Sequence, residues 1–280
     1  MSLLGAARIR ELAAALDLQP SKSLGQNFVI DSNICTKIVR IAGVNKDDIA
    51  LEIGPGLGSL TLALLNSAAS VVAVEIDHRL ATQLPLTAAE HSEYSQNLVV
   101  LRADALALVE LPVQPTVLVA NLPYNVSVTV LLNLLERFPT LRSGVVMVQA
   151  EVADRLAATS GSKEYGVPSL KAAWWAEVKA AGSVSRSVFW PVPNVDSKLV
   201  AFTRRASPGD EALRIKTFAV IDAAFAQRRK MLRSALSSRY GSSSAAEEIL
   251  VRAGVDPTLR GEALEISSFS AIALSQPDIF

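Results

Sequence analysis

The sequence of 280 residues contains one cysteine and two histidines. A single cysteine, Cys35, cannot form an intramolecular disulfide, and this favours a reducing compartment. Cys35, His78 and His91 do not have the spacing of a zinc site, so we expect no bound metal.

Long hydrophobic runs are also missing. No uninterrupted apolar segment reaches the ~18 residues needed to cross a bilayer. Arg8, Arg10 and Glu11 interrupt the only segment that could have been a secretory signal. We therefore expect a soluble, cytoplasmic, monomeric protein that makes no contact with a membrane. The length and the 50% hydrophobic content suffice for one large domain, alone or with a smaller one.

The chain has no excess of either charge, because 27 basic residues balance 27 acidic ones. This argues against a protein that coats nucleic acid non-specifically. The basic residues are nevertheless clustered, and no acid occurs between Ala223 and Ala246. The cluster consists of Arg228, Arg229, Lys230, Arg233 and Arg239. A second cluster consists of Arg186, Lys198, Arg204 and Arg205, with Asp196 opposing it. Either cluster could contact phosphates or be a solvated face.

Helices and strands alternate from about residue 31. Short apolar runs predict strands at 48–54, 70–77, 97–104, 116–122 and 143–150, and two closing strands at 175–185 and 197–205. Helical patterns lie between these first five strands, except between 97–104 and 116–122, although Pro85 is expected to interrupt the helix at 78–86. The alternation predicts an α/β fold with a Rossmann-like, doubly wound, mainly parallel sheet.

The pattern changes after the turn-forming segment "ASPGD" at 206–210. Beyond it the sequence is mainly helical, beginning with a long helical stretch from 211 to 237. We predict an α/β domain over 1–205 and a small all-helical domain over 206–280.

A glycine-rich loop, "LEIGPGLGSL", joins the first strand to its helix. Gly54 and Gly56 let the backbone turn tightly and approach a ligand. Glu75 ends the next strand, at the distance where an acid accepts ribose hydroxyl hydrogen bonds, and Asp104 ends the third. Each acid alone could be a solvated turn residue. Together the loops predict a crevice for an adenosine-containing cofactor.

The spacing of this loop is G-x-G-x-G, not the G-x-G-x-x-G that binds dinucleotides. No histidine or tyrosine is evidently placed for hydride chemistry. The loop with Glu52 before it, and Glu75 and Asp104 after it, resembles S-adenosylmethionine-dependent methyltransferases.

The fourth strand ends in Asn121-Leu122-Pro123-Tyr124 beside that crevice. The Asn121 amide oxygen and the Leu122 carbonyl could accept both N–H groups of an adenine amine, which would localise its lone pair. Pro123 fixes the backbone, and Tyr124 offers a face for a base flipped out of its stack. The alternative is a turn with an Asx cap and a buried tyrosine.

The quartet has the form of the N-P-P-Y-type motif of nucleobase amino-methyltransferases. From about residue 20 to beyond 265 the chain resembles the KsgA (RsmA) family of ribosomal RNA adenine dimethyltransferases. The resemblance rests on "SKSLGQNF" (21–28), "EIGPGLGSLT" (52–61), "NLPYNVS" (121–127), "SKEYG" (162–166), "FWPVPNVDSKLV" (189–200) and "FAQRRKMLRSAL" (225–236).

This resemblance implies transfer of four methyl groups from S-adenosylmethionine to two adjacent adenines. These lie near the 3′ end of 16S rRNA, in the small ribosomal subunit or its precursor, and the reaction is coupled to subunit biogenesis. The implied cofactor contacts are Asn27, Val29, Gly54, Glu75, Asp104 and Asn121. Position 29 is Val where the family most often has Leu, and Trp190 replaces a usually smaller residue.

The resemblance also implies two contacts with RNA. Phe189 would stack on the target base opposite Tyr124, although it could equally be a core aromatic. Arg228, Arg229, Lys230 and Arg233 would contact phosphates from the first helix of the second domain.

Two other functions fit part of this pattern. Erm-type 23S rRNA adenine methyltransferases share the fold, but usually read N-I-P-Y or N-I-P-F and usually lack the G-Q-N-F of residues 25–28. A ribosome-assembly or nucleic-acid-binding factor without catalysis is the second alternative. Intact Gly54, Glu75 and Asn121 argue against loss of activity.

Overall fold

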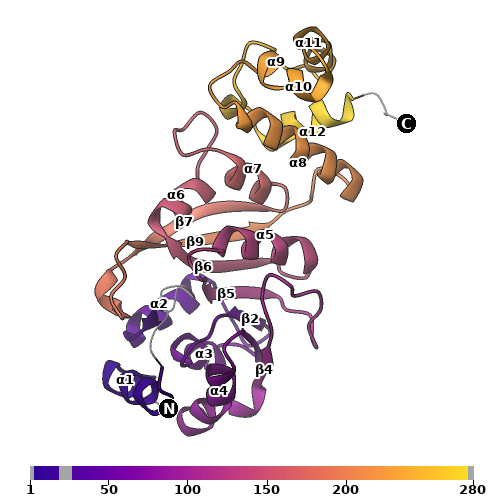
Figure 1. The fold of residues 1–280 in the computed structure, drawn as a ribbon. Coiled ribbons are helices and arrows are strands. Elements are labelled where there is room, and N and C mark those ends of the chain that lie inside the picture. The colour runs from indigo at the N-terminus through magenta and orange to yellow at the C-terminus, as the bar shows by residue number, and fades with distance from the viewer. Residues whose placement is uncertain (1–2, 19–26, 277–280) are drawn as a thin grey trace. The chain divides into compact units, whose positions relative to one another are not determined.

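The computed structural model describes residues 3–18 and 27–276. Contacts divide the chain into two compact units, Met1–Ala153 with Lys179–Arg204, and Asp154–Val178 with Arg205–Phe280. The first unit contains the sheet, and the second is built from helices (Figure 1).

A seven-stranded sheet forms the centre of the first unit (Figure 1). Its strands, in spatial order, are β4 (Leu98–Arg102), β3 (Ser70–Glu75), β2 (Ile49–Ile53), β5 (Val117–Asn121), β6 (Ser143–Gln149), β9 (Ser197–Arg204) and β7 (Ala176–Val184). The first five run parallel to their neighbours, and β9 is antiparallel to β6. The predicted Rossmann-like, mainly parallel sheet is confirmed.

Helices cover the sheet because each crossover presents an apolar stripe to it. The crossover helices are α2 (Ser32–Ile41), α3 (Ser59–Leu65), α4 (His78–His91) and α5 (Ser127–Arg137), and α1 (Ala6–Ala15) precedes them. In α2, Ile34, Cys35 and Ile38 are buried with residues of β5 and β6 in one apolar cluster. The predicted interruption at Pro85 is wrong. Helix α4 continues to His91, since buried Leu84 and Ala88 hold it on the unit's core.

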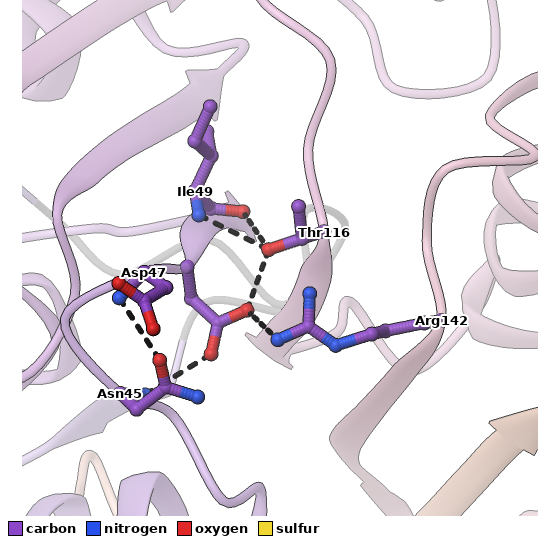
Figure 2. Close-up of polar contacts among 6 residues, drawn as sticks. Asn45, Asp47, Ile49, Thr116 and Arg142 are labelled. Carbon is purple, nitrogen blue, oxygen red and sulfur yellow. Dashed lines mark hydrogen bonds and ion pairs between the residues drawn. The ribbon is translucent and has the colours of Figure 1, made fainter.

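A buried carboxylate joins the segments that lead into β2, β5 and β6, at the edge where these strands begin. Asp48 is 1% exposed and accepts hydrogen bonds from the Thr116 hydroxyl at 2.6 Å and the Arg142 guanidinium at 2.5 Å. The backbone N–H of Asn45 is a third donor, at 3.0 Å. Thr116 in turn accepts from the Ile49 N–H at 3.1 Å, as Figure 2 shows. We call these residues the Asp48 cluster, and infer that it fixes the relative positions of three central strands.

The second unit is helical. It contains α7 (Val167–Ala173), α8 (Glu211–Ala226), α9 (Leu232–Ala235), α10 (Ser237–Tyr240), α11 (Ser243–Arg252) and α12 (Ile266–Leu274), and α6 (Ala150–Leu156) crosses the boundary between the units. The sequence-based boundary at 205 differs from this division, which also assigns 154–178 to the helical unit. The reason is that this segment packs on residues far away in the sequence. The rings of Trp174 and Trp175 contact Phe218 edge-on, and the Tyr165 hydroxyl donates to the Leu264 carbonyl at 3.0 Å. That the two units are separate domains stays a prediction.

Candidate functional site

A cavity of about 240 Å³ lies at the carboxyl ends of β2, β3, β4 and β5. The chain order of the sheet reverses between β2 and β5, and crevices at such reversals are where open α/β sheets bind ligands. All seven residues predicted to contact a cofactor line this cavity: Asn27, Val29, Gly54, Gly56, Glu75, Asp104 and Asn121. Pro123 lines it as well.

The glycine loop between β2 and α3 forms one wall of the cavity. Gly54 and Gly56 both have positive φ, +67° and +58°, in the left-handed region where a side chain is disfavoured. A Cβ at Gly56 would also lie only 3.0 Å from the Phe28 ring. Phe28 belongs to β1 (Phe28–Val29), which pairs with β8 (Phe189–Trp190) in a two-stranded ribbon. Gly56 therefore lets this ribbon close against the loop.

Glu75, the last residue of β3, is buried at the cavity wall. Its two oxygens accept from the N–H groups of Gly56 at 3.1 Å and Asp77 at 3.0 Å. Burial raises the pKa of this carboxyl, and the two N–H donors oppose that shift. Each oxygen keeps a lone pair for a further donor. Asp104, two residues beyond β4, is exposed and is held by the Leu106 N–H at 2.9 Å.

Glu52 is a cavity residue whose burial the sequence did not reveal. It is 1% exposed, lines the cavity from β2, and accepts from the Thr61 hydroxyl at 2.6 Å. Burial raises its pKa to about 8, and the charge of Glu75 adds to the rise. The part of the cavity wall that the structure describes includes three acids and no lysine, arginine or histidine. Such a wall suits a ligand that is positively charged or rich in hydrogen-bond donors.

The end of β5 presents an unpaired acceptor beside this wall. The Asn121 amide nitrogen donates to the Asn27 carbonyl at 3.2 Å. The Asn121 amide oxygen is buried and has no hydrogen-bond partner within the described residues. Because the Asn27 carbonyl can only accept, the NH₂ group must face it, and this leaves the oxygen for another donor. A buried acceptor left unpaired costs about 1–3 kcal/mol, so a ligand N–H there would be favoured.

The remaining groups of the 121–124 turn are held in place. The Leu122 N–H donates to the Met147 carbonyl at 3.1 Å, and the Leu122 side chain is buried. The Pro123 carbonyl accepts from Val126 at 3.2 Å. The half-buried Tyr124 makes a 2.7 Å hydrogen bond between its hydroxyl and that of Ser197, a partner that no sequence motif predicts.

Phe189 does not join this group. It is 1% exposed, lies in the apolar cluster with Val29, and is not among the cavity-lining residues. The structure therefore places it as the core aromatic that the sequence left as an alternative. The expected stacking on a base does not fit this placement, since no face of the ring is open. Its neighbour Trp190 stacks on Phe28 with the ring centroids 6.3 Å apart.

The basic segment of the helical unit is not one continuous helix. Helix α8 ends at Ala226, and α9 begins at Leu232. Arg228 pairs with Glu262 at 2.9 Å and donates to the Lys163 carbonyl at 2.6 Å. The next two residues, Arg229 and Lys230, are exposed.

A second arginine of this cluster, Arg233, pairs with Glu247 at 3.2 Å. The charge of the predicted RNA-binding residues is thus partly balanced inside the unit. Arg204 of the second basic cluster is also engaged, because its guanidinium donates to the carbonyls of Leu135 and Leu141, both at 2.6 Å. Burial lowers the Arg204 pKa. Its guanidinium therefore caps the end of α5 and is not available to a phosphate.

Comparison with known proteins agrees with this geometry. The family described as "Ribosomal RNA adenine dimethylase" matches residues 18–274. The chain is 59% identical over 275 residues to ribosomal RNA small subunit methyltransferase A of Leifsonia xyli, covering 98% of each chain. It is 59% identical over 277 residues to the protein of the same name from Thermobifida fusca, covering 98% of this chain and 96% of that one.

Two solved structures are similar over most of the chain. A dimethyladenosine transferase from Plasmodium falciparum has a TM-score of 0.73 at 23% identity, with 88% of this chain and 95% of that one covered. The 23S rRNA methyltransferase ErmE has a TM-score of 0.66 at 26% identity, with 89% and 99% covered. The first likeness supports the fold alone.

Proposed function

The chain belongs to the ribosomal RNA adenine dimethylase family, and on this premise we propose that it dimethylates adenine amines of small-subunit rRNA. The substrate is two adjacent adenines near the 3′ end of 16S rRNA, in the small subunit or its precursor. The methyl donor is S-adenosylmethionine, and the product is N6,N6-dimethyladenosine. The observation that carries the proposal is the buried, unpaired Asn121 oxygen at the wall of an acidic cavity.

The cavity fits this donor by its chemistry. Positive φ at Gly54 and Gly56 lets bare backbone approach the ligand, and Glu75 keeps acceptor capacity for hydroxyl groups such as those of a ribose. The acidic wall suits the positive charge of a sulfonium, and that charge would in turn favour the ionised form of Glu52, whose pKa burial raises to about 8. When bound, the cofactor supplies an electrophilic methyl group on positively charged sulfur. Asn27, Val29 and Asp104 would complete the contacts.

The 121–124 turn would hold the adenine. The Asn121 oxygen accepts one N–H of the exocyclic amine, and the Leu122 carbonyl accepts the other. Both contacts localise the nitrogen lone pair, which is otherwise delocalised into the ring. Tyr124 supports the face of the flipped base. The rate then comes chiefly from orienting two bound reactants, and the amine loses its proton to water after transfer.

Contacts with RNA would come from the exposed part of the basic segment. Arg229 and Lys230 are exposed there, whereas Arg228 and Arg233 are paired with acids. Such contacts position RNA without reading its sequence. Within the described residues, no helix is long and apolar enough to span a membrane. The monomeric state and the cytoplasmic location expected from the sequence belong to this proposal.

The comparisons favour the small subunit over the large one. The relatives at 59% identity bear the name of small-subunit enzymes, whereas the 23S rRNA enzyme ErmE is 26% identical. A non-catalytic assembly factor would have no need for the unpaired Asn121 oxygen. An additional role in assembly remains compatible with methyl transfer.

The test is transfer of label from S-adenosylmethionine to ribosomal subunits. Small subunits whose target adenines are unmethylated should take up label, and large subunits in a parallel reaction should not. Label in the large subunit alone would favour the Erm-type reading. If neither is labelled while calorimetry still detects cofactor binding, the proposal fails in favour of an assembly factor.

A further inference from the structure

A hydroxyl from a distant segment holds the aromatic residue of the 121–124 turn. The Tyr124 hydroxyl and the Ser197 hydroxyl are 2.7 Å apart, although 73 positions separate the residues in the sequence. Ser197 is 0% exposed, and Tyr124 is half-buried. The hydrogen bond of the half-buried tyrosine to this buried serine restricts both side chains, because neither can turn away without losing its partner.

Ser197 is itself fixed in the sheet. It is the first residue of β9 and lies opposite Gln149 in the antiparallel pairing with β6. The next N–H of the chain, that of Ala150, donates to the Asp196 carbonyl at 2.8 Å. Strand β6 also accepts the Leu122 N–H through the Met147 carbonyl. The serine and the backbone of the turn are thus held by the same strand.

The turn's backbone does not depend on this hydroxyl pair. Pro123 fixes one dihedral angle, and the Ser127 hydroxyl donates to the Tyr124 carbonyl at 3.3 Å. The Ser197 bond acts beyond these contacts, at the far end of the phenol ring. What it determines is therefore the direction of the ring, which otherwise could rotate about two side-chain dihedral angles.

We propose that Ser197 is a positioning residue for methyl transfer, which sets the Tyr124 ring in the orientation that supports the acceptor base. The inference rests on the proposed function, since it assigns to Tyr124 the support of an adenine. Ser197 does not itself line the cofactor cavity. Its loss should consequently slow the transfer of methyl groups and leave the binding of the cofactor intact.

The test uses Ser197→Ala, Tyr124→Phe and the double variant in the full chain. Rates of transfer to unmethylated small subunits give kcat and KM, and calorimetry gives the Kd for S-adenosylmethionine. We expect Ser197→Ala to lower kcat about fivefold to tenfold, with Kd unchanged within about twofold. Tyr124→Phe keeps the ring but removes the same bond, so it should have a similar effect. The double variant should be no slower than either single one.

Ser270→Ala is the matched control. Ser270 is another buried serine, 5% exposed, and its hydroxyl donates to the Ile266 carbonyl at 2.7 Å within α12 of the helical unit. This variant should keep the wild-type kcat. A drop in kcat equal to that of Ser197→Ala would show a general effect of losing a buried hydroxyl, and would overturn the inference.

Two other outcomes also overturn it. One is a wild-type kcat in Ser197→Ala, and the other is a double variant whose defect equals the product of the two single defects. Should Ser197→Ala fail to fold, Tyr124→Phe alone decides, because an unchanged kcat there rejects the role of the bond. Failure of the proposed function is distinguishable, because wild-type protein would then transfer no methyl groups to small subunits.

Discussion

Replacing Glu52 by glutamine should remove a pH-dependent loss of stability that this buried carboxyl imposes. Glu52 is 1% exposed, and burial raises its pKa from an ordinary value of 4.5 to about 8. Between these values the folded protein keeps a proton that the unfolded chain has released. Stability contributed by the protonated carboxyl is therefore complete below about pH 4.5, and is lost as the pH rises towards about 8.

The magnitude follows from the same linkage. One proton bound only by the folded state changes the free energy of unfolding by about 1.4 kcal/mol per pH unit. Between pH 4.5 and about 8 this amounts to roughly 5 kcal/mol. A typical domain has a free energy of unfolding of only about 5–15 kcal/mol, so the effect is large. Glutamine keeps the shape and the acceptor for the Thr61 hydroxyl, but it does not titrate.

Urea unfolding of both proteins at about pH 5.5, 7 and 8.5 measures this difference. As the pH rises, the free energy of unfolding of the wild type should fall relative to that of Glu52→Gln. Thr61→Val keeps the carboxyl but removes a donor that lowers its pKa, so its stability should still fall with rising pH, over a window that extends to higher pH than in the wild type. A difference in the free energy of unfolding between wild type and Glu52→Gln that is equal at all three pH values would show that Glu52 does not bind a proton preferentially in the folded state. Adding S-adenosylmethionine should reduce the wild-type loss, because a bound cation favours the ionised carboxylate.

Four other variants test three separate parts of the structure. Asn121→Ala should lower the rate of methyl transfer by about 10²–10³-fold, and calorimetry should show only modestly weaker cofactor binding; wild-type turnover would reject the proposed role. Changing Arg229 and Lys230 together to Ala should weaken binding of small subunits and reduce the slope of log K against log salt by up to about 2. An unchanged slope in this double variant would contradict contact with RNA. Arg228→Ala should instead lower mainly the stability of the helical unit, since Arg228 is paired with Glu262. Thr116→Val should lower the free energy of unfolding by about 1–3 kcal/mol in urea, because the Asp48 cluster loses a donor; unaltered stability would argue against this cluster.

The sheet and the cofactor loops could be predicted because their signals are local. A buried parallel strand reads as a short apolar run, and the group that follows it must lie at one edge of the sheet. Gly54, Glu75, Asp104 and Asn121 are all of this kind, and all line one cavity. Their position at one edge of the sheet followed from the place of each residue at the end of a predicted parallel strand.

Other features depend on contacts between distant segments, which a local pattern does not contain. The positive charge of the run around Arg228 appears unbalanced in the sequence because its acidic partners lie outside the run: Glu262 is 34 positions from Arg228, and Glu247 is 14 positions from Arg233. Phe189 reads equally as a stacking surface or a core residue, and the apolar cluster that buries it includes residues far away in the sequence, such as Val29. The partnership of Tyr124 with Ser197 also crosses 73 positions.

The long helical stretch predicted from 211 to 237 shows a different limit. Its residues keep helical periodicity across the break, but α8 ends at Ala226 and the chain turns before α9. The turn is held from outside the stretch: Leu232 donates its N–H to the Leu259 carbonyl at 2.7 Å, and Arg228 is tied to Lys163 and Glu262. Propensity within the segment could not reveal these contacts.

The proposed activity of this protein is the formation of dimethyladenosine at two adjacent positions of 16S rRNA. The most direct measurement is mass spectrometry of nuclease digests from unmethylated small subunits, after incubation with the wild-type protein and S-adenosylmethionine. We expect N6,N6-dimethyladenosine at two neighbouring adenines near the 3′ end, and no such product with Asn121→Ala. Methylation of a different base, or of 23S rRNA in place of 16S rRNA, would contradict it.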